Sequence, residues 1–352
     1  MTAATYPYEA LRKFAAALGE KAGLPADRAR TQAEILLEAD LMGHTTHGLA
    51  LLPGLLKAVE SGTIRRTGEP QVLSDRGSTV FWDASSLPGT WLLTRAIGAA
   101  RERVASHPVV TFVLRNMSHI GALGAYLRQA TDHGLVIAIM NSDPGMRTVA
   151  PAGGKEGQLA PNPLAFGYPT DRDPILIDIS TSSVANGWVR RWNAEGRRLP
   201  GKWLQDVDGN VTDNPAVLFG IPPGTMLPLG GLELGHKGFA LGLMVDALTT
   251  GLSGAGRGTK VPGGGTPVFL QLIDPNAFAG MQALKRETGL LAQACRSSNP
   301  RTGVAAVRMP GDTALARRRA QLEKGVELYP SIMPDLMPWA EKFGITAPPQ
   351  RS

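Results

Sequence analysis

Two histidines lie three residues apart in the segment 43–48, which reads GHTTHG and closely follows Asp40. Such a pair could ligate a metal, but no Glu stands where a zinc hydrolase needs its general base, and no Cys or second acidic ligand is close in sequence. An imidazole can instead exchange protons near neutrality, because its unperturbed pKa is ~6.5. The segment therefore predicts proton transfer without a metal. Two histidines that only cap a helix remain the alternative.

Two further segments have the composition of anion-binding sites. Residues 116–124 (NMSHIGALG) join an apolar run to a helical pattern, and residues 234–239 (LGHKGF) open a long apolar helix. At the start of a helix, free backbone N–H groups and the helix dipole favour a phosphate or a carboxylate. Each motif is a weak signal alone, and ordinary turn chemistry is the alternative for the first.

A carboxylate and a glycine-rich stretch complete the set of candidate motifs. Asp178 stands at the C-terminal end of the apolar run 175–177, where it could orient a histidine or merely cap the next helix. The stretch 254–258 (GAGRG) has the composition of a dinucleotide-binding loop, yet it follows a helix and no βαβ unit surrounds it. We interpret it as part of a flexible loop over 253–267.

The elements that must position these groups alternate between helical and extended patterns. The N-terminal region is predicted to be helical to about residue 62, with an apolar stripe that recurs at helical spacing from Leu11 to Leu18. Later helices are predicted at 92–104, 121–133 and from about 314, and strands at 71–73, 79–82, 109–113, 135–140, 175–177 and 303–307. This alternation indicates α/β architecture. With 352 residues, the chain exceeds the usual size of a single core, so we expect two lobes and allow for a smaller third element.

Composition limits the class of protein. The formal net charge is +6, and basic residues form short clusters at 190–191, 197–198 and 317–319. These clusters lack interleaved aromatic residues, so nucleic-acid binding is the less favoured interpretation. A solvated basic surface that attracts anionic ligands is the favoured one. Cys295 is the only cysteine, which fits a reducing compartment. The N-terminal helix has no apolar signal core, and the longest apolar stretch, 238–252, is too short to span a bilayer. We therefore expect a cytoplasmic protein with no membrane or nucleic-acid partner.

Taken together and in order, these motifs resemble the malate/L-lactate dehydrogenase family, which also includes ureidoglycolate dehydrogenases, sulfolactate dehydrogenases and cyclic imino acid reductases. No single unit is specific, but eight units in the same order make coincidence improbable. The matching units are Asp40 with 43–48, SHIG at 118–121, NP at 162–163, Asp178 with 181–182, DVDG at 206–209, LPLGG at 227–231, GHKGF at 235–239 and RMPG at 308–311.

The resemblance implies an α/β, non-Rossmann NAD(P)-binding fold with a mixed sheet and an N- and C-terminal helical region. Residues 1–118 plus 305–352 would form the helical, substrate and dimerisation region, and residues 119–304 the NAD(P)-binding domain. It also implies a homodimer whose active sites involve both subunits, and the apolar stripe of the N-terminal helix is a candidate contact.

The resemblance also implies roles for individual residues. By similarity, His47 would be the acid/base, with Asp178 orienting it and Thr46 nearby. The residues that would surround the NAD or NADP cofactor are His119, Gly121, Asn162, Thr181, His236, Lys237, Gly238 and Arg308.

One departure from the family concerns the substrate. Many members have an Arg where this chain has Leu51 and a Tyr where it has Leu55. That Arg is the expected clamp for an acid substrate, so its loss weakens a malate or lactate assignment and favours a bulkier or more apolar acid. Arg147 could replace it as a substrate residue, and a plain surface arginine is the alternative.

The predicted reaction is hydride transfer between NAD(P) and a small 2-hydroxy acid or its 2-oxo acid, with a histidine as proton relay. One alternative is NAD(P)H-dependent reduction of the C=N bond of a cyclic imino acid. Another is a catalytically lapsed member that binds a metabolite or serves as an oligomeric scaffold. The retained His47, Asp178 and Lys237 argue against a lapsed site.

Overall fold

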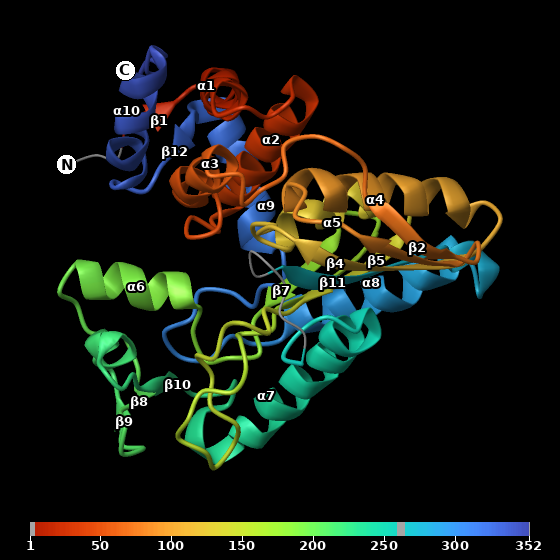
Figure 1. Ribbon diagram of the computed structural model, residues 1–352. Coiled ribbons are helices and arrows are strands. Elements are labelled where there is room, and N and C mark those ends of the chain that lie inside the picture. The colour runs from red at the N-terminus through yellow and green to blue at the C-terminus, as the bar shows by residue number, and fades with distance from the viewer. Residues whose placement is uncertain (1–3, 259–264, 352) are drawn as a thin grey trace.

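A seven-stranded mixed sheet forms the centre of the computed structural model, which describes residues 4–258 and 265–351 (Figure 1). The strand order is β2-β3-β4-β11-β5-β6-β7, and β3–β4 is the parallel pair while each other neighbouring pair is antiparallel. The strands are β2 (Gln71–Asp75), β3 (Thr79–Asp83), β4 (Val109–Met117), β5 (Val136–Asn141), β6 (Leu164–Tyr168), β7 (Ile175–Ile179) and β11 (Thr266–Ile273). This topology differs from a doubly wound parallel sheet, which confirms the expected mixed, non-Rossmann α/β fold.

Alternating side chains explain the central strands of the sheet. In β4, Val110, Phe112 and Leu114 are fully buried, as the period of two along a strand requires. Their cross-strand partners on β11 are also fully buried and apolar: Leu272, Leu270 and Val268. Helices α4 (Gly89–Val104) and α5 (Gly124–Thr131) pack on this sheet, and α8 (Met281–Ser297) lies on the lower side of the molecule in Figure 1.

The two ends of the chain form a helical region with its own hydrophobic core. It contains α1 (Tyr8–Lys21), α2 (Ala26–Met42), the turn η1 (Leu49–Leu51), α3 (Leu52–Glu60) and α10 (Ile332–Phe343), together with the paired strands β1 (Thr5–Tyr6) and β12 (Val326–Glu327). The apolar stripe of α1 packs against α2 within the same chain, so the expectation that this stripe needs a partner subunit is wrong. Helix α9 (Asp312–Lys324) is joined to α2 by the Arg318–Glu38 ion pair at 2.7 Å, and its Leu315 belongs to the hydrophobic core of the sheet.

A third, smaller cluster lies at the lower left of Figure 1. Its apolar core includes Val149, Val189 and Leu204, and its elements are α6 (Asn186–Ala194), β8 (Leu204–Gln205), β9 (Val211–Thr212), η2 (Pro215–Phe219) and β10 (Thr225–Met226). The chain then enters α7 (Gly231–Asp246), which continues through a π-helical turn, η3 (Ala247–Gly251). A short turn, η4 (Pro275–Ala277), follows β11. The described residues therefore form two large hydrophobic cores and one smaller core, in line with the expected two lobes and smaller third element.

Several expectations fail in the second half of the chain. The expected strand at 303–307 is wrong: this segment is an exposed turn, with Val304 39% exposed. The sequence patterns did not predict strand β6 or helices α6 and α8. Strand β11 begins at Thr266, inside the expected loop 253–267. Residues 259–264 of that loop lie outside the described part of the chain. The domain boundary expected at residue 118 stays a prediction; β2, β3 and β4 of the sheet precede it and the other four strands follow it.

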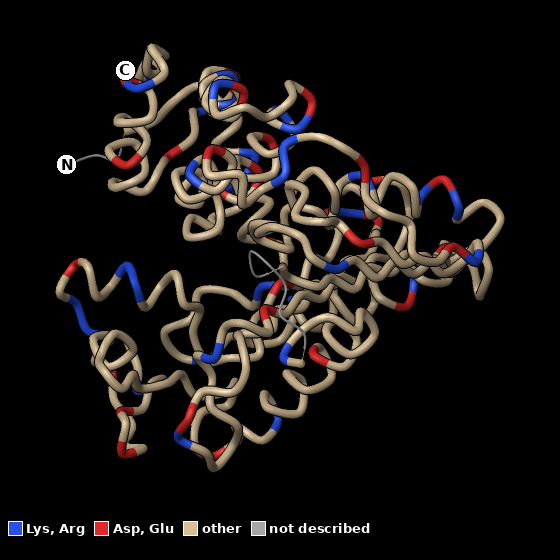
Figure 2. Tube along the Cα trace, in the orientation of Figure 1, with Lys and Arg blue, Asp and Glu red and all other residues tan. Residues whose placement is uncertain are grey.

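Charged side chains are spread over all three regions, with Lys and Arg interspersed among Asp and Glu along the chain (Figure 2). None of the helices in the described ranges is long and apolar enough to cross a membrane.

Candidate active site

The two histidines of the segment 43–48 lie in a loop that a buried carboxylate holds in place. Helix α2 ends at Gly43, whose φ of 90° turns the chain into the loop. Asp40, one turn earlier, accepts the backbone N–H of Leu49 at 2.8 Å. A Cβ atom at Gly48 would overlap the Asp40 carboxylate, so only glycine fits there. Burial raises the pKa of Asp40 to about 7.

His47 has the geometry and protonation state of a general base. Its Nδ1 lies 2.8 Å from Thr46 Oγ1, a contact that fixes the ring and leaves Nε2 for a reacting group. Burial lowers the pKa of His47 from 6.5 to about 4; the neighbouring His119, His44 and Arg191 side chains add to this lowering, and Asp178 opposes it. The imidazole is therefore neutral at neutral pH and able to accept a proton.

His119 lies beside His47, with 5.9 Å between the ring centroids. Its Nδ1 accepts the backbone N–H of Gly121 at 3.0 Å, so the proton of the neutral ring is on Nε2. One side of the ring opens to solvent, while the protein on its other sides lowers the pKa by desolvation. His119 is thus a neutral hydrogen-bond donor next to the candidate base.

Asp178 lies at the same site but contacts the other histidine of the loop. Its Oδ2 accepts the backbone N–H of Gly124 at 2.7 Å and is 4.0 Å from His44 Nε2. The structure thus gives His47 a hydrogen bond to Thr46, and the influence of Asp178 on His47 is a longer-range charge effect that raises its pKa.

Helix α6 contacts the histidine loop through Arg191, which sequence reasoning did not single out. The two terminal nitrogens of Arg191 donate to Thr45 Oγ1 at 2.8 Å and to the Thr45 carbonyl at 3.0 Å. Its guanidinium lies 3.5 Å from the ring centroid of Tyr329. Gly187 of α6 also approaches closely, since a Cβ there would be 2.8 Å from Thr46 Cβ. The expectation that Arg191 belongs to a solvated basic cluster is therefore wrong.

The expected anion site at 116–124 is occupied by internal hydrogen bonds. The backbone N–H groups of Gly121 and Gly124 donate to His119 and Asp178, and those of Ala125 and Tyr126 donate to carbonyls of the preceding turn. These four amides are not free for a phosphate. The site instead uses them to orient its own side chains.

The GHKG motif lies inside α7 rather than at its start. The helix begins at Gly231, so the prediction that the motif opens the helix is wrong by one turn. The glycines of α7 form its packed face: a Cβ at Gly238 would overlap the Leu229 backbone, and one at Gly242 would be 3.2 Å from Thr181 Oγ1. His236 and Lys237 are exposed on the same helix.

Two of the expected cofactor residues lie behind this glycine face. Asn162 is buried at a φ of 40°, and its Nδ2 donates to the Gly242 carbonyl at 2.9 Å. Thr181 Oγ1 donates to the Pro161 carbonyl at 2.9 Å. Arg308, by contrast, is exposed and donates to Thr313 Oγ1 at 2.7 Å.

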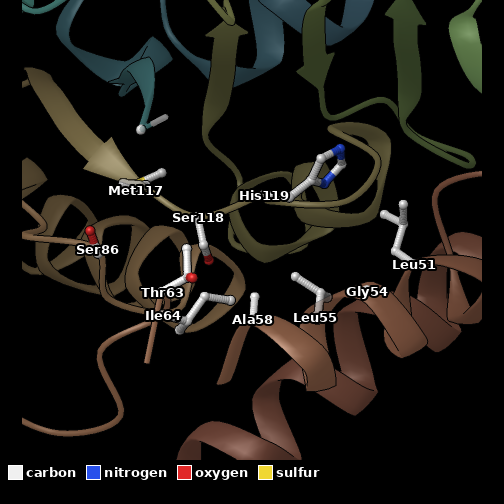
Figure 3. Close-up of a pocket in the computed structure, with 11 residues that line it drawn as sticks. Leu51, Gly54, Leu55, Ala58, Thr63, Ile64, Ser86, Met117, Ser118 and His119 are labelled. Atoms are coloured by element: carbon white, nitrogen blue, oxygen red, sulfur yellow. The ribbon is translucent and has the colours of Figure 1, made fainter. Parts of the chain in front are cut away.

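A cavity of about 280 Å³ opens beside His119 (Figure 3). Leu51 of η1 and Gly54 and Leu55 of α3 line one side of it, and the segment 117–119 at the end of β4 lines the other. Arg147 is exposed and does not line this cavity. Among the described residues, no cluster of three or more His, Cys, Asp or Glu side chains is arranged to hold a metal ion.

Comparison with known proteins gives consistent matches over nearly the whole chain. A family profile described as malate/L-lactate dehydrogenase matches residues 6–337. An L-lactate dehydrogenase from Cupriavidus necator is 31% identical over 335 residues, covering 92% of this chain and 94% of the relative.

Solved structures agree with this match. A malate dehydrogenase from Pyrococcus horikoshii superimposes with a TM-score of 0.87 at 26% identity, covering 97% of this chain and 96% of that one. A delta1-piperideine-2-carboxylate reductase from Pseudomonas syringae superimposes with a TM-score of 0.81 at 29% identity, covering 96% and 99%.

Proposed function

Since the chain belongs to the malate/L-lactate dehydrogenase family, we propose that it interconverts a small 2-hydroxy acid and its 2-oxo acid with NAD or NADP, using His47 as the proton relay. The observation that carries this proposal is the state of His47: a neutral, partly buried imidazole with one nitrogen held by Thr46. Such a group removes the hydroxyl proton during oxidation and returns it during reduction.

The charges around His47 suit this reaction. When bound, the nicotinamide ring would supply the hydride acceptor or donor. Oxidation leaves a proton on His47, and Asp178 stabilises the resulting imidazolium because its charge raises the pKa of His47. His119 Nε2–H can donate to the substrate oxygen, which becomes more negative as the hydroxyl proton leaves. Arg191 adds a permanent positive charge that favours an anionic substrate.

The residues present fit a nicotinamide cofactor. Asn162 Oδ1 is buried and finds no hydrogen-bond partner among the described residues, so an amide donor on a ligand would satisfy it. The exposed cations on α7 suit the phosphates of a dinucleotide. We propose that NAD or NADP is held by His119, Gly121, Asn162, Thr181, His236, Lys237, Gly238 and Arg308.

Reduction of a cyclic imino acid is the second candidate. The same histidine would protonate nitrogen in place of oxygen. The superposition on a delta1-piperideine-2-carboxylate reductase at 29% identity supports it. A substrate panel distinguishes the two reactions.

We further propose that the protein forms a homodimer through α7. Leu232, Leu234, Leu243 and Met244 are 61%, 48%, 48% and 40% exposed on this helix, more apolar surface than an isolated helix usually leaves in water. We propose that a second copy of the chain covers this apolar surface of α7, because closed symmetric dimers are the commonest assembly of soluble proteins. The expected cofactor residues His236 and Lys237 lie on the same helix. The covering subunit would then lie next to the proposed cofactor residues.

A kinetic experiment tests the proposed function. The purified protein is assayed through the absorbance of reduced nicotinamide, with NADH and NADPH against 2-oxo acids and cyclic imino acids. His47→Asn should lower kcat by roughly 10²- to 10⁴-fold while the cofactor still binds. His44→Asn is the matched control and should retain most of the activity. Loss of activity in His44→Asn with full activity in His47→Asn would assign the relay to the other histidine.

A further inference from the structure

The cavity beside His119 is larger than the smallest 2-oxo acids need. Its volume of about 280 Å³ corresponds to roughly nine water molecules at ~30 Å³ each. It begins at His119, whose ring centroid is 5.9 Å from that of His47. A substrate carbon held at His47 would therefore carry its side chain towards this space.

The lining of the cavity is apolar on the α3 side. Leu51, Leu55, Ala58 and Ile64 contribute hydrocarbon, while Thr63, Ser86 and Ser118 contribute neutral hydroxyl or backbone groups. Of the described residues that line it, only His119 is ionisable, and its lowered pKa keeps it neutral at neutral pH. Arg65 and Arg66 line only the adjoining pocket, which shares Thr63, Ile64 and Ser86 with this one. A carboxylate or sulfonate placed against Leu51 and Leu55 would therefore lose water without a counter-charge in direct contact, which is unfavourable.

Gly54 leaves part of the space open. A Cβ atom at this position meets nothing within 4 Å, and the residue has an ordinary helical conformation inside α3. A larger side chain at this position, which lines the cavity next to Leu55 (Figure 3), is therefore accommodated without backbone strain. The absence of a side chain at residue 54 thus sets how long a substrate group can be.

We propose that this cavity binds the uncharged, apolar side chain of a 2-hydroxy or 2-oxo acid, and that Gly54 determines the length of side chain accepted. This inference rests on the proposed function, because it places the reacting carbon at His47. The preferred substrate has a side chain of several carbons, and acids with a second negative charge are poor substrates.

The test is a series of 2-oxo acids of increasing length: pyruvate, 2-oxobutyrate, 2-oxovalerate and 2-oxohexanoate, with oxaloacetate as the charged member. In the wild type, kcat/KM should rise about fourfold per added methylene, which corresponds to ~0.8 kcal/mol. Oxaloacetate should fall at least about tenfold below 2-oxovalerate, since its second carboxylate has no partner. A wild type that prefers oxaloacetate to 2-oxovalerate would overturn the proposal.

Two substitutions at Gly54 test whether the size of the cavity sets the preferred length of the substrate side chain. Gly54→Ala should slightly shorten the substrate side chain that the enzyme prefers, and Gly54→Leu should abolish the gain in kcat/KM for substrates longer than 2-oxobutyrate. Gly98→Leu is the matched control, because Gly98 is also a helical glycine whose Cβ meets nothing within 4 Å and it does not line the cavity. An unchanged chain-length profile in Gly54→Leu would refute the role of this residue.

Binding is measured in parallel so that the two proposals fail separately. If no 2-oxo acid is reduced with either cofactor, the proposed reaction fails. The ligand-induced rise in Tm for the same acids then still tests the cavity. A rise that grows with chain length in the wild type and in Gly98→Leu, but not in Gly54→Leu, supports the binding site. A rise independent of chain length overturns it.

Discussion

The protonation state of His47 can be shifted in opposite directions by two substitutions. Asp178 raises the pKa of His47, and Arg191 lowers it. Asp178→Asn should therefore lower this pKa, and Arg191→Met should raise it. Asn can still accept the N–H of Gly124, so Asp178→Asn removes mainly the charge. Met keeps an unbranched side chain against Tyr329 but loses both hydrogen bonds to Thr45 as well as the charge.

The size of the shifts follows from simple electrostatics. A unit charge ~8 Å away in an effective dielectric of about 20 contributes about 2 kcal/mol, or about 1.5 pKa units, before screening by salt. Asp178 has the larger effect of the two residues on His47 and Arg191 the smaller. We expect a decrease of roughly one unit for Asp178→Asn and an increase of roughly half a unit for Arg191→Met.

The assay is the pH dependence of kcat/KM for hydroxy acid oxidation, which reports groups of the free enzyme. Oxidation needs neutral His47, so the rate should fall as pH falls through the pKa of about 4. Reduction needs the imidazolium, of which only about one molecule in a thousand is present at pH 7, so kcat/KM for reduction should fall as pH rises above about 4. A bound anionic substrate raises the pKa of His47. The pH range over which kcat changes, called here the limb of the profile, therefore lies at higher pH than the corresponding limb of kcat/KM.

The opposite signs are the decisive result. Neutral stocks are transferred to each pH immediately before assay, and circular dichroism verifies that the protein stays folded. Limbs that coincide in all three proteins, or that move in the same direction in both variants, would refute the assignment of the titration to His47. Arg191→Lys is the control, since it keeps the charge and should retain the wild-type limb to within a few tenths of a unit.

Three further predictions concern stability, cofactor and assembly. The pKa of Asp40 is raised from 3.8 to about 7, so its contribution to the free energy of unfolding is full below about pH 4 and falls by roughly 4 kcal/mol as pH rises from about 4 to about 7. Urea unfolding of Asp40→Asn should lack this pH-dependent loss over the same range. Lys237→Ala should weaken NADH or NADPH binding by about tenfold in a fluorescence titration, whereas equal affinity would remove Lys237 from the cofactor site. Sedimentation should show a dimer that Leu232→Glu dissociates, and a fully active wild-type monomer would contradict the proposed interface.

Local patterns were sufficient for the elements that carry their own signal. The stripe from Leu11 to Leu18 has helical spacing, and the structure buries it in α1. The apolar run before Asp178 forms β7 and delivers this carboxylate to the site, as its position at a strand end predicted. In both cases the pattern spans a few residues, and the period of the element determines which side chains are buried.

Elements whose position depends on distant parts of the chain could not be predicted from local sequence patterns. β11 lies between β4 and β5 in the sheet although more than a hundred residues separate it from either strand, and nothing within its own sequence indicates that position. The apolar run 303–307 has the composition of a strand, but it pairs with no strand among the described residues. Helix α7 begins earlier than predicted because its glycines, which are poor helix formers, pack closely against Leu229 and Thr181. Tertiary contact overrides local preference there.

The position of Arg191 explains why the site could be only partly predicted. Each of the three hydrophobic cores contributes a different group to His47: the helical region provides the loop, the sheet provides Asp178 through β7, and the third cluster provides Arg191 through α6. Arg191 and Thr45 are 146 residues apart in the chain, so no sequence spacing connects them. The pKa of His47 therefore depends on how the cores are packed against one another. The catalytic group is set by local sequence, whereas its protonation state is a property of the whole fold.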